Sequence, residues 1–443
     1  MSDVPEFRLT VDQNPYLPAG GREMHAVLGV RSLGGGRPAE AAQVIVLDTS
    51  GSMTYGGKLR AAKRAALTAL DTIRDGVHFA VVGGANQPRM IYPPSPERLV
   101  RMDGRSRARA KDAVEAMDAK GGTAIGTWLL FAHKLLAARP DAVRHALLLT
   151  DGKNQHETAD ELGRALDRCA GGFTCHALGV GTDWAVAELR RISSVLLGEF
   201  LDVAEPDDLE QRFRELTETA MAKEVPDVAL RVWTPQHARL RFVKQMAPVL
   251  DDLTARGVPS GRQTVDYPLG AWGAEEREYH LCVEVPPGGV GRRMRAAWAK
   301  LLLPGGEAAA SGDVLAEWTD DVGRATLING RVARHTDQAE LAEAVQEGLA
   351  ARREGDEETA TARLGRAVVL ARQVGNEQVA DLLDRVVDVL DAASGTVRLK
   401  KDVAKADEMS LDTRSVRTVP TRLGEPSPGT GRTARTRPGE PGA

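Results

Sequence analysis

The sequence predicts a doubly wound parallel α/β sheet inserted in an antiparallel β-sandwich, followed by a small α-helical region and a disordered tail. Three observations support this fold class. Apolar runs alternate with helix-like segments from about residue 42 to 222, the pattern of a parallel sheet with helices on both faces. Strand-like runs separated by Pro and Gly occupy residues 227 to about 335. Runs of the same type, 7–11 and 23–30, precede the α/β segment.

The α/β segment divides into short buried strands and amphipathic helices. The predicted strands are continuous apolar runs, as expected when both faces of a parallel sheet are covered; they are 44–47, 78–82, 145–150, 175–180 and 199–203. Helices are predicted at 59–73, 126–138, 162–169, 186–197 and 207–223, most clearly where apolar residues recur with helical spacing, as in the first and last of these. A charged helix is predicted at 105–119.

The two flanking β segments are expected to form a single sandwich. The early strands have no place in a doubly wound sheet, whereas the later runs alternate as sandwich strands do. The later runs are 228–233, 240–243, 279–283 and 296–303. We therefore expect the α/β domain to be an insertion with both of its ends anchored in the sandwich.

The C-terminal part changes character twice. Residues 337–410 keep helical spacing, which favours a small packed helical region; a single tetratricopeptide-type pair could not form a solenoid. From Thr413 onward the chain is rich in Pro, Gly, Thr and Arg, which is typical of disorder. The predicted parts are 1–38 (first sandwich strands), 42–223 (α/β domain), 226–335 (sandwich), 337–410 (helical region) and 413–443 (tail).

Composition limits the classes of partner. The net charge of −4 gives no general preference for nucleic acid or membrane surfaces. No segment approaches the roughly 20 apolar residues of a membrane span, and the first residues lack a signal-peptide pattern. Three cysteines form neither a disulfide framework nor a zinc motif. We therefore expect a cytoplasmic protein with no nucleic-acid or membrane partner.

Oxygen-bearing side chains cluster where predicted strands end. Asp48, Ser50 and Ser52 follow the first strand of the α/β segment, and Asp151 follows the strand 145–150. Thr123 follows a Gly-Gly pair between them. Open parallel sheets bind ligands beyond the carboxyl ends of their strands. Carboxylates and hydroxyls suit hard cations, so we predict a Mg²⁺ site, with Mn²⁺ or Ca²⁺ as alternatives; without His or Cys, zinc or copper is a poor match.

These five residues, in this order, resemble the metal-ion-dependent adhesion site of von Willebrand factor type A domains. The resemblance implies that the three hydroxyls ligate the metal directly and that the two aspartates do so directly or through water. It leaves one coordination position for an Asp or Glu of a partner. The implied function is a metal-dependent protein-binding scaffold that is not an enzyme.

More broadly, residues 1–412 look like bacterial, especially actinobacterial, von Willebrand factor A proteins of the tellurite-resistance-associated type. Those proteins are often linked to Ser/Thr kinases, PP2C phosphatases and forkhead-associated domains, which implies a role in phospho-signalling or stress response. Thr418 and Thr421 in the tail are then candidates for phosphorylation and for contact with an Arg-bearing reader domain. The alternative is a solvated tail without a role.

Enzyme and structural alternatives remain. A dehalogenase-type phosphatase needs a second Asp where Ser50 stands, and a phosphate loop fails because one residue too many precedes Lys58. A metal-dependent hydrolase would need further carboxylates, for which only Asp183 and Glu157 are at hand. His156 is expected to be a solvated loop residue rather than a ligand. The remaining alternative is a structural scaffold whose metal site is not used for partner binding.

Overall fold

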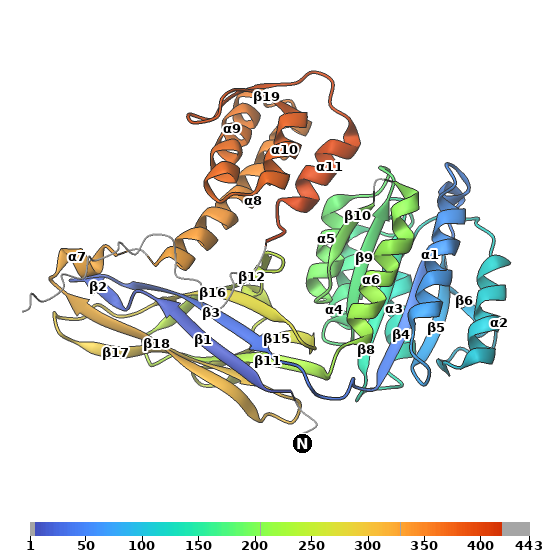
Figure 1. Ribbon diagram of the computed structural model, residues 1–443, viewed down its shortest axis with the longest axis horizontal. Coiled ribbons are helices and arrows are strands. Elements are labelled where there is room, and N and C mark those ends of the chain that lie inside the picture. The colour runs from blue at the N-terminus through green and yellow to red at the C-terminus, as the bar shows by residue number, and fades with distance from the viewer. Residues whose placement is uncertain (1–4, 204, 328, 419–443) are drawn as a thin grey trace, which may run out of the picture.

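The computed structural model describes residues 5–203, 205–327 and 329–418. Figure 1 shows an α/β domain beside a β-sandwich, with a helical region that lies over the sandwich and returns toward the α/β domain through its last helix. The predicted fold class is confirmed: a parallel sheet flanked by helices, additional antiparallel sheets and a helical C-terminal region.

The α/β domain is built on a seven-stranded sheet with the order β10-β9-β8-β4-β5-β6, and β7 also pairs with β5. Its strands are β4 (Ala41–Asp48), β5 (His78–Gly84), β6 (Arg89–Tyr92), β7 (Val100–Arg101), β8 (Val143–Thr150), β9 (Thr174–Val180) and β10 (Phe200–Val203). All neighbouring pairs are parallel except those of β6 and β7 with β5. The sequence pattern does not predict these two short edge strands, because neither has an apolar run long enough to stand out.

Helices cover both faces of this sheet. They are α1 (Lys58–Thr72), α2 (Gly104–Glu115), α3 (Ile125–Leu136), α4 (Ala159–Cys169), α5 (Val186–Val195) and α6 (Leu209–Met221). Alternate residues of β4 face opposite sides: Ile45 joins the core formed with α1, α2 and α6, whereas Val44 joins the core formed with α3, α4 and α5. The continuous apolar pattern of the central strands therefore follows from burial on both faces.

The sandwich consists of a five-stranded sheet, β1-β3-β16-β12-β13, and a six-stranded sheet, β14-β15-β11-β17-β18-β2. Its strands are β1 (Phe7–Gln13), β2 (Tyr16–Pro18), β3 (Glu23–Ser32), β11 (Val225–Trp233), β12 (Arg239–Ala247), β13 (Asp251–Asp252), β14 (Val258–Gly261), β15 (Thr264–Trp272), β16 (Glu276–Glu284), β17 (Arg293–Leu302) and β18 (Ala308–Thr319). The early strands pair with the late ones, β3 with β16 and β2 with β18. Where the chain enters and leaves the α/β domain, the Ala39 N–H donates to the Lys223 carbonyl oxygen at 3.0 Å. The insertion prediction is therefore confirmed.

The helical region contains α7 (Val322–Ala325), α8 (Gly330–Glu354), α9 (Glu357–Gln373), α10 (Glu377–Val386) and α11 (Lys405–Arg414). An unpredicted hairpin, β19 (Val387–Asp391) and β20 (Thr396–Leu399), lies between α10 and α11. Its strands are short and carry several charged residues, so they lack a clear strand signal. Val345, Leu364, Leu383 and Leu411 contribute to one apolar core of this region.

The prediction of disorder from Thr413 is wrong for residues 413–418. Thr413 and Val416 are buried, and Arg417 pairs with Val249 beside the sandwich. The Thr418 N–H donates to the Pro248 carbonyl oxygen at 2.9 Å, and its hydroxyl donates to the carbonyl oxygen of Met246. Residues 413–418 are ordered because backbone acceptors at the end of β12 bind Thr418 and because Val416 has an apolar site. Their composition alone favours disorder. Thr421 lies outside the described residues.

Among the residues that the structure describes, no helix combines the length and the apolar character needed to cross a membrane.

Candidate metal centre

Adjacent strands bring the two aspartates together. β4 and β8 are parallel neighbours with Leu47 opposite Leu149, so Asp48 and Asp151 emerge at the same edge of the sheet. Both side chains are fully buried. After Asp48 the chain forms a short 3₁₀ helix, Gly51–Thr54, which turns Ser52 back toward Asp151.

Backbone hydrogen bonds attach the Thr123 loop to this edge. The Thr49 carbonyl oxygen accepts from the Lys120 N–H at 2.7 Å, and the Gly121 carbonyl oxygen accepts from the Gly51 N–H at 2.9 Å. Thr123 Oγ1 and Ser52 Oγ both border Gly152, where an added Cβ would lie 3.6 Å and 3.7 Å from them. The structure thus gathers all five predicted ligand residues in one place.

His156 has a positioning role that the sequence analysis missed. Its ring is exposed, yet Nδ1 accepts from the Thr123 N–H at 3.2 Å, and the His156 N–H donates to the Thr123 carbonyl oxygen at 3.0 Å. His156 is therefore not simply solvated. It holds the backbone of one candidate ligand, and only the folded arrangement of the two loops reveals this.

The oxygen atoms of the site form a continuous chain. Ser50 Oγ lies 3.0 Å from Ser52 Oγ, and Ser52 Oγ donates to Asp151 Oδ1 at 2.7 Å. The Asp48 carboxylate accepts from the Ser50 N–H at 2.7 Å and from the Thr150 hydroxyl at 2.6 Å. Burial raises the pKa of Asp48 above its usual value, an effect that the hydrogen bonds from Ser50 and Thr150 oppose.

These spacings fit a hard divalent cation. Octahedral Mg²⁺ binds oxygen at about 2.0–2.1 Å, so adjacent ligand oxygens around it lie about 3 Å apart. The Ser50–Ser52 and Ser52–Asp151 separations of 3.0 and 2.7 Å are close to that value. Two carboxylates match the charge of the ion, and hydroxyls add ligands without adding charge. The donor set therefore suits Mg²⁺, Mn²⁺ or Ca²⁺.

Lys58 is a further residue of the site. It stands in the first turn of α1, and its Nζ lies 2.8 Å from Asp151 Oδ2 and 3.6 Å from Asp183 Oδ2. Its side chain is 15% exposed, so this ammonium is a largely buried cation in contact with a candidate ligand. No local pattern reveals the pair, because the two residues are 93 positions apart.

We expect Lys58→Met to raise the affinity for Mg²⁺ about tenfold, equivalent to about 1.4 kcal/mol. Removing a positive charge beside Asp151 removes its repulsion of the metal ion and leaves the site more negative. Calorimetric titration with Mg²⁺ measures the change. Lys63→Met is a matched control, because Lys63 lies on the same helix and donates to the Glu115 carbonyl oxygen. Equal affinities of wild type and the Lys58 variant would show that the ammonium does not oppose the metal.

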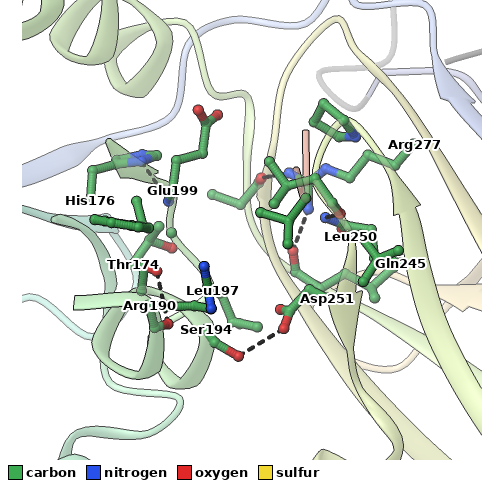
Figure 2. A pocket seen from close by; sticks show the side chains of 18 of the residues that line it. Thr174, His176, Arg190, Ser194, Leu197, Glu199, Gln245, Leu250, Asp251 and Arg277 are labelled. Atoms are coloured by element: carbon green, nitrogen blue, oxygen red, sulfur yellow. Dashed lines mark hydrogen bonds between the residues drawn. The ribbon is translucent and has the colours of Figure 1, made fainter. Parts of the chain in front are cut away.

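A cavity of about 360 Å³ lies at the other end of the sheet, between the α/β domain and the sandwich (Figure 2). Residues at the amino ends of β8 and β9, including His145 and His176, form one wall. Asp251 and Arg277 belong to the sandwich wall, and Ser194 Oγ donates across to Asp251 Oδ1 at 2.7 Å. Because the walls come from different domains, sequence periodicity gives no sign of this cavity.

Two families of known proteins match the chain. The von Willebrand factor type A domain matches residues 43–153, which include most of β4 and all five candidate ligand residues. The von Willebrand factor type A C-terminal domain matches residues 369–415, which include α10, the hairpin and α11.

Solved structures extend the similarity to almost the whole chain. A von Willebrand factor type A protein from Catenulispora acidiphila is 46% identical, covers 94% of this chain and 98% of its own, and superposes with a TM-score of 0.90. The ArnB paralog VWA2 from Sulfolobus acidocaldarius covers 93% and 97% with a TM-score of 0.54; at 13% identity it shows a shared fold alone. The Synechocystis protein sll0103 is 29% identical over 218 residues, 48% of this chain, and the match spans about half of that relative's length.

Proposed function

The chain belongs to the von Willebrand factor type A family, and on that basis we propose that it binds an acidic side chain of a partner protein through a divalent cation. Domains of this family generally mediate metal-dependent protein interactions. The observation that carries the proposal is the cluster of oxygen donors, which would hold the cation through Asp48, Ser50, Ser52, Thr123 and Asp151. When bound, the cation offers an open coordination position to which a carboxylate of the partner can bind.

The charges of the site explain why binding should depend on metal. Asp48 and Asp151 together present two carboxylates at one edge of the sheet. Lys58 offsets one of them, but its ammonium already contacts Asp151. A partner's Asp or Glu would therefore meet uncompensated negative charge unless a dication neutralised it.

A binding role is favoured over catalysis by the surroundings of the other carboxylates. Glu157, a candidate for a second metal, instead accepts from the Gly126 N–H and from the Asn154 side chain, each at 2.7 Å. Asp183 lies beside Lys58. Hydrolysis with two metals needs carboxylates free to bridge them. We therefore propose a non-enzymatic scaffold; the resemblance to tellurite-resistance-associated proteins suggests phospho-signalling or stress response as its setting.

The proposal is tested in two steps, the first of which concerns the metal alone. We expect wild-type protein to bind one equivalent of Mg²⁺, Mn²⁺ or Ca²⁺ in a calorimetric titration, and Asp48→Ala to lose at least about 100-fold in affinity, or about 2.7 kcal/mol. Asp141→Ala, an exposed aspartate just before β8, is the matched control and should bind as wild type.

The second step concerns the partner. Affinity capture with immobilised wild type, Asp48→Ala and Asp141→Ala, each with Mg²⁺ or with EDTA, should yield a partner only with Mg²⁺ and an intact Asp48. Replacing the partner's contacting Asp or Glu with Asn or Gln should then abolish the interaction. A partner retained equally with EDTA and by Asp48→Ala would instead support a structural scaffold whose metal site is not used for binding.

A further inference from the structure

A second cluster of metal-ligating side chains lies on the five-stranded sheet of the sandwich. Glu23 and His25 belong to β3, and Cys282 belongs to the neighbouring β16. His25 is directly opposite Cys282 in the antiparallel register. We propose that Glu23, His25 and Cys282 form a separate site for a zinc-type transition-metal dication with one coordination position left open.

The distances between the ligand atoms support this assignment. One ligand atom of each of the three residues lies within 4.8 Å of the other two, and His25 Nε2 lies 3.8 Å from Cys282 Sγ. Tetrahedral zinc binds nitrogen at about 2.0–2.1 Å and sulfur at about 2.3 Å, which separates the two ligand atoms by about 3.6 Å. The pair therefore needs to move only a few tenths of an ångström to bind such an ion.

His280 orients His25 for metal binding. His280 Nε2 lies 3.1 Å from His25 Nδ1, so His25 can donate through Nδ1 and direct the lone pair of Nε2 toward Cys282. The Phe242 and His280 rings pack edge to face with centroids 5.0 Å apart, and this contact restricts the position of His280.

The cluster is open to solvent on one side, which leaves a path for a metal ion to enter. Glu23 is exposed and His25 half-buried, so the cluster opens to solvent on that side, whereas Cys282 is 2% exposed. Metal binding would form the metal–sulfur bond and release the thiol proton to solvent.

The two proposed metal sites differ in donor chemistry. The site at Asp48 has oxygen ligands only, whereas this cluster combines imidazole, thiol and carboxylate, a set that selects zinc-type ions over Mg²⁺. The sites also lie in different domains of the chain. The inference therefore does not rest on the proposed function.

Titration of the full chain with Co²⁺ tests the site directly, because only a thiolate ligand produces the near-ultraviolet sulfur-to-cobalt absorption band. We expect one equivalent of Co²⁺ to develop this band in wild type and Zn²⁺ to displace it. Cys282→Ser should lose the band, and Glu23→Gln, at an exposed position, should bind more weakly. His280→Gln should keep the band but bind about 10–100-fold more weakly, since it removes the partner that orients His25.

Two controls separate this site from others in the chain. Cys169→Ser, which alters a buried cysteine in α4, and Asp48→Ala should both keep the wild-type band and affinity. Circular dichroism establishes that each variant is folded. The absence of the band in wild type, or its persistence in a folded Cys282→Ser variant, would overturn the assignment.

Discussion

Glu275→Gln is expected to lower the free energy of unfolding by about 3–5 kcal/mol, the cost of breaking a buried ion pair. Glu275 lies where the α/β domain meets the sandwich and accepts from Lys223 Nζ at 2.9 Å and from Arg277 at 3.0 Å. The side chains of both cations are 13% exposed. Burial alone would raise the pKa of Glu275, but Arg277 and Lys223 hold it below its usual value, so the carboxylate is charged.

A neutral amide in place of Glu275 would leave two largely buried cations without their shared carboxylate. Arg277 keeps its hydrogen bonds to the carbonyl oxygens of Leu269 and Ala271, whereas no such second acceptor is seen for Lys223 among the described residues. Urea unfolding measures the loss. Glu284→Gln is a matched control at the other end of β16, where a more exposed pair with Arg241 should contribute less than about 1 kcal/mol. Equal losses for the two variants would show that water already solvates the domain junction.

Stability is also expected to fall by about 3 kcal/mol between pH 6.5 and pH 4 through His176 alone, because 1 pKa unit corresponds to about 1.4 kcal/mol. Burial lowers the pKa of His176 to about 4 from the ordinary value of 6.5. Between those values the unfolded chain binds a proton that the folded chain does not. The contribution is therefore fully present above pH 6.5 and is lost as the pH falls toward 4.

A hydrogen bond from Glu199 adds to the cost of protonating the buried His176 ring. Its Nδ1 accepts from the Glu199 N–H at 2.9 Å in the cavity wall, and protonation would destroy that acceptor (Figure 2). The ring of His145 lies 4.8 Å away and is also buried, and burial lowers its pKa well below the usual value. Both histidines therefore lower the free energy of unfolding as the pH falls.

The measurement is the difference between variants in denaturant unfolding at pH 7, 6, 5 and 4. His176→Asn, whose amide oxygen can accept from Glu199, should flatten the dependence on pH. His237→Asn, at an exposed histidine with a positive φ that Asn tolerates, should keep the wild-type slope. An unchanged slope in the His176 variant would show that folding does not lower the pKa of this ring.

Sequence patterns predict the elements and site residues of this chain correctly where local interactions determine them. The apolar runs that predict β4 and β8 also locate Asp48 and Asp151 at strand ends, and parallel pairing brings those ends together. Lys58 escapes prediction because its partner is distant in the chain and an ordinary helix-surface lysine has the same local sequence. Residues 413–418 escape it because their order depends on backbone acceptors supplied by β12 and the residues that follow it.

The insertion of one domain into another sets an order for synthesis. β1 can pair with β3 at once, but the other edge of β3 hydrogen-bonds to β16, with His25 opposite Cys282, and β16 is made much later on the ribosome. The α/β sheet, by contrast, is complete once β10 has been made, and α6 closes it. Domains generally fold as units while the chain grows. The nascent chain would therefore carry a finished α/β domain beside a β1–β3 pair, and the free edge of β3 favours association with other chains until β16 emerges.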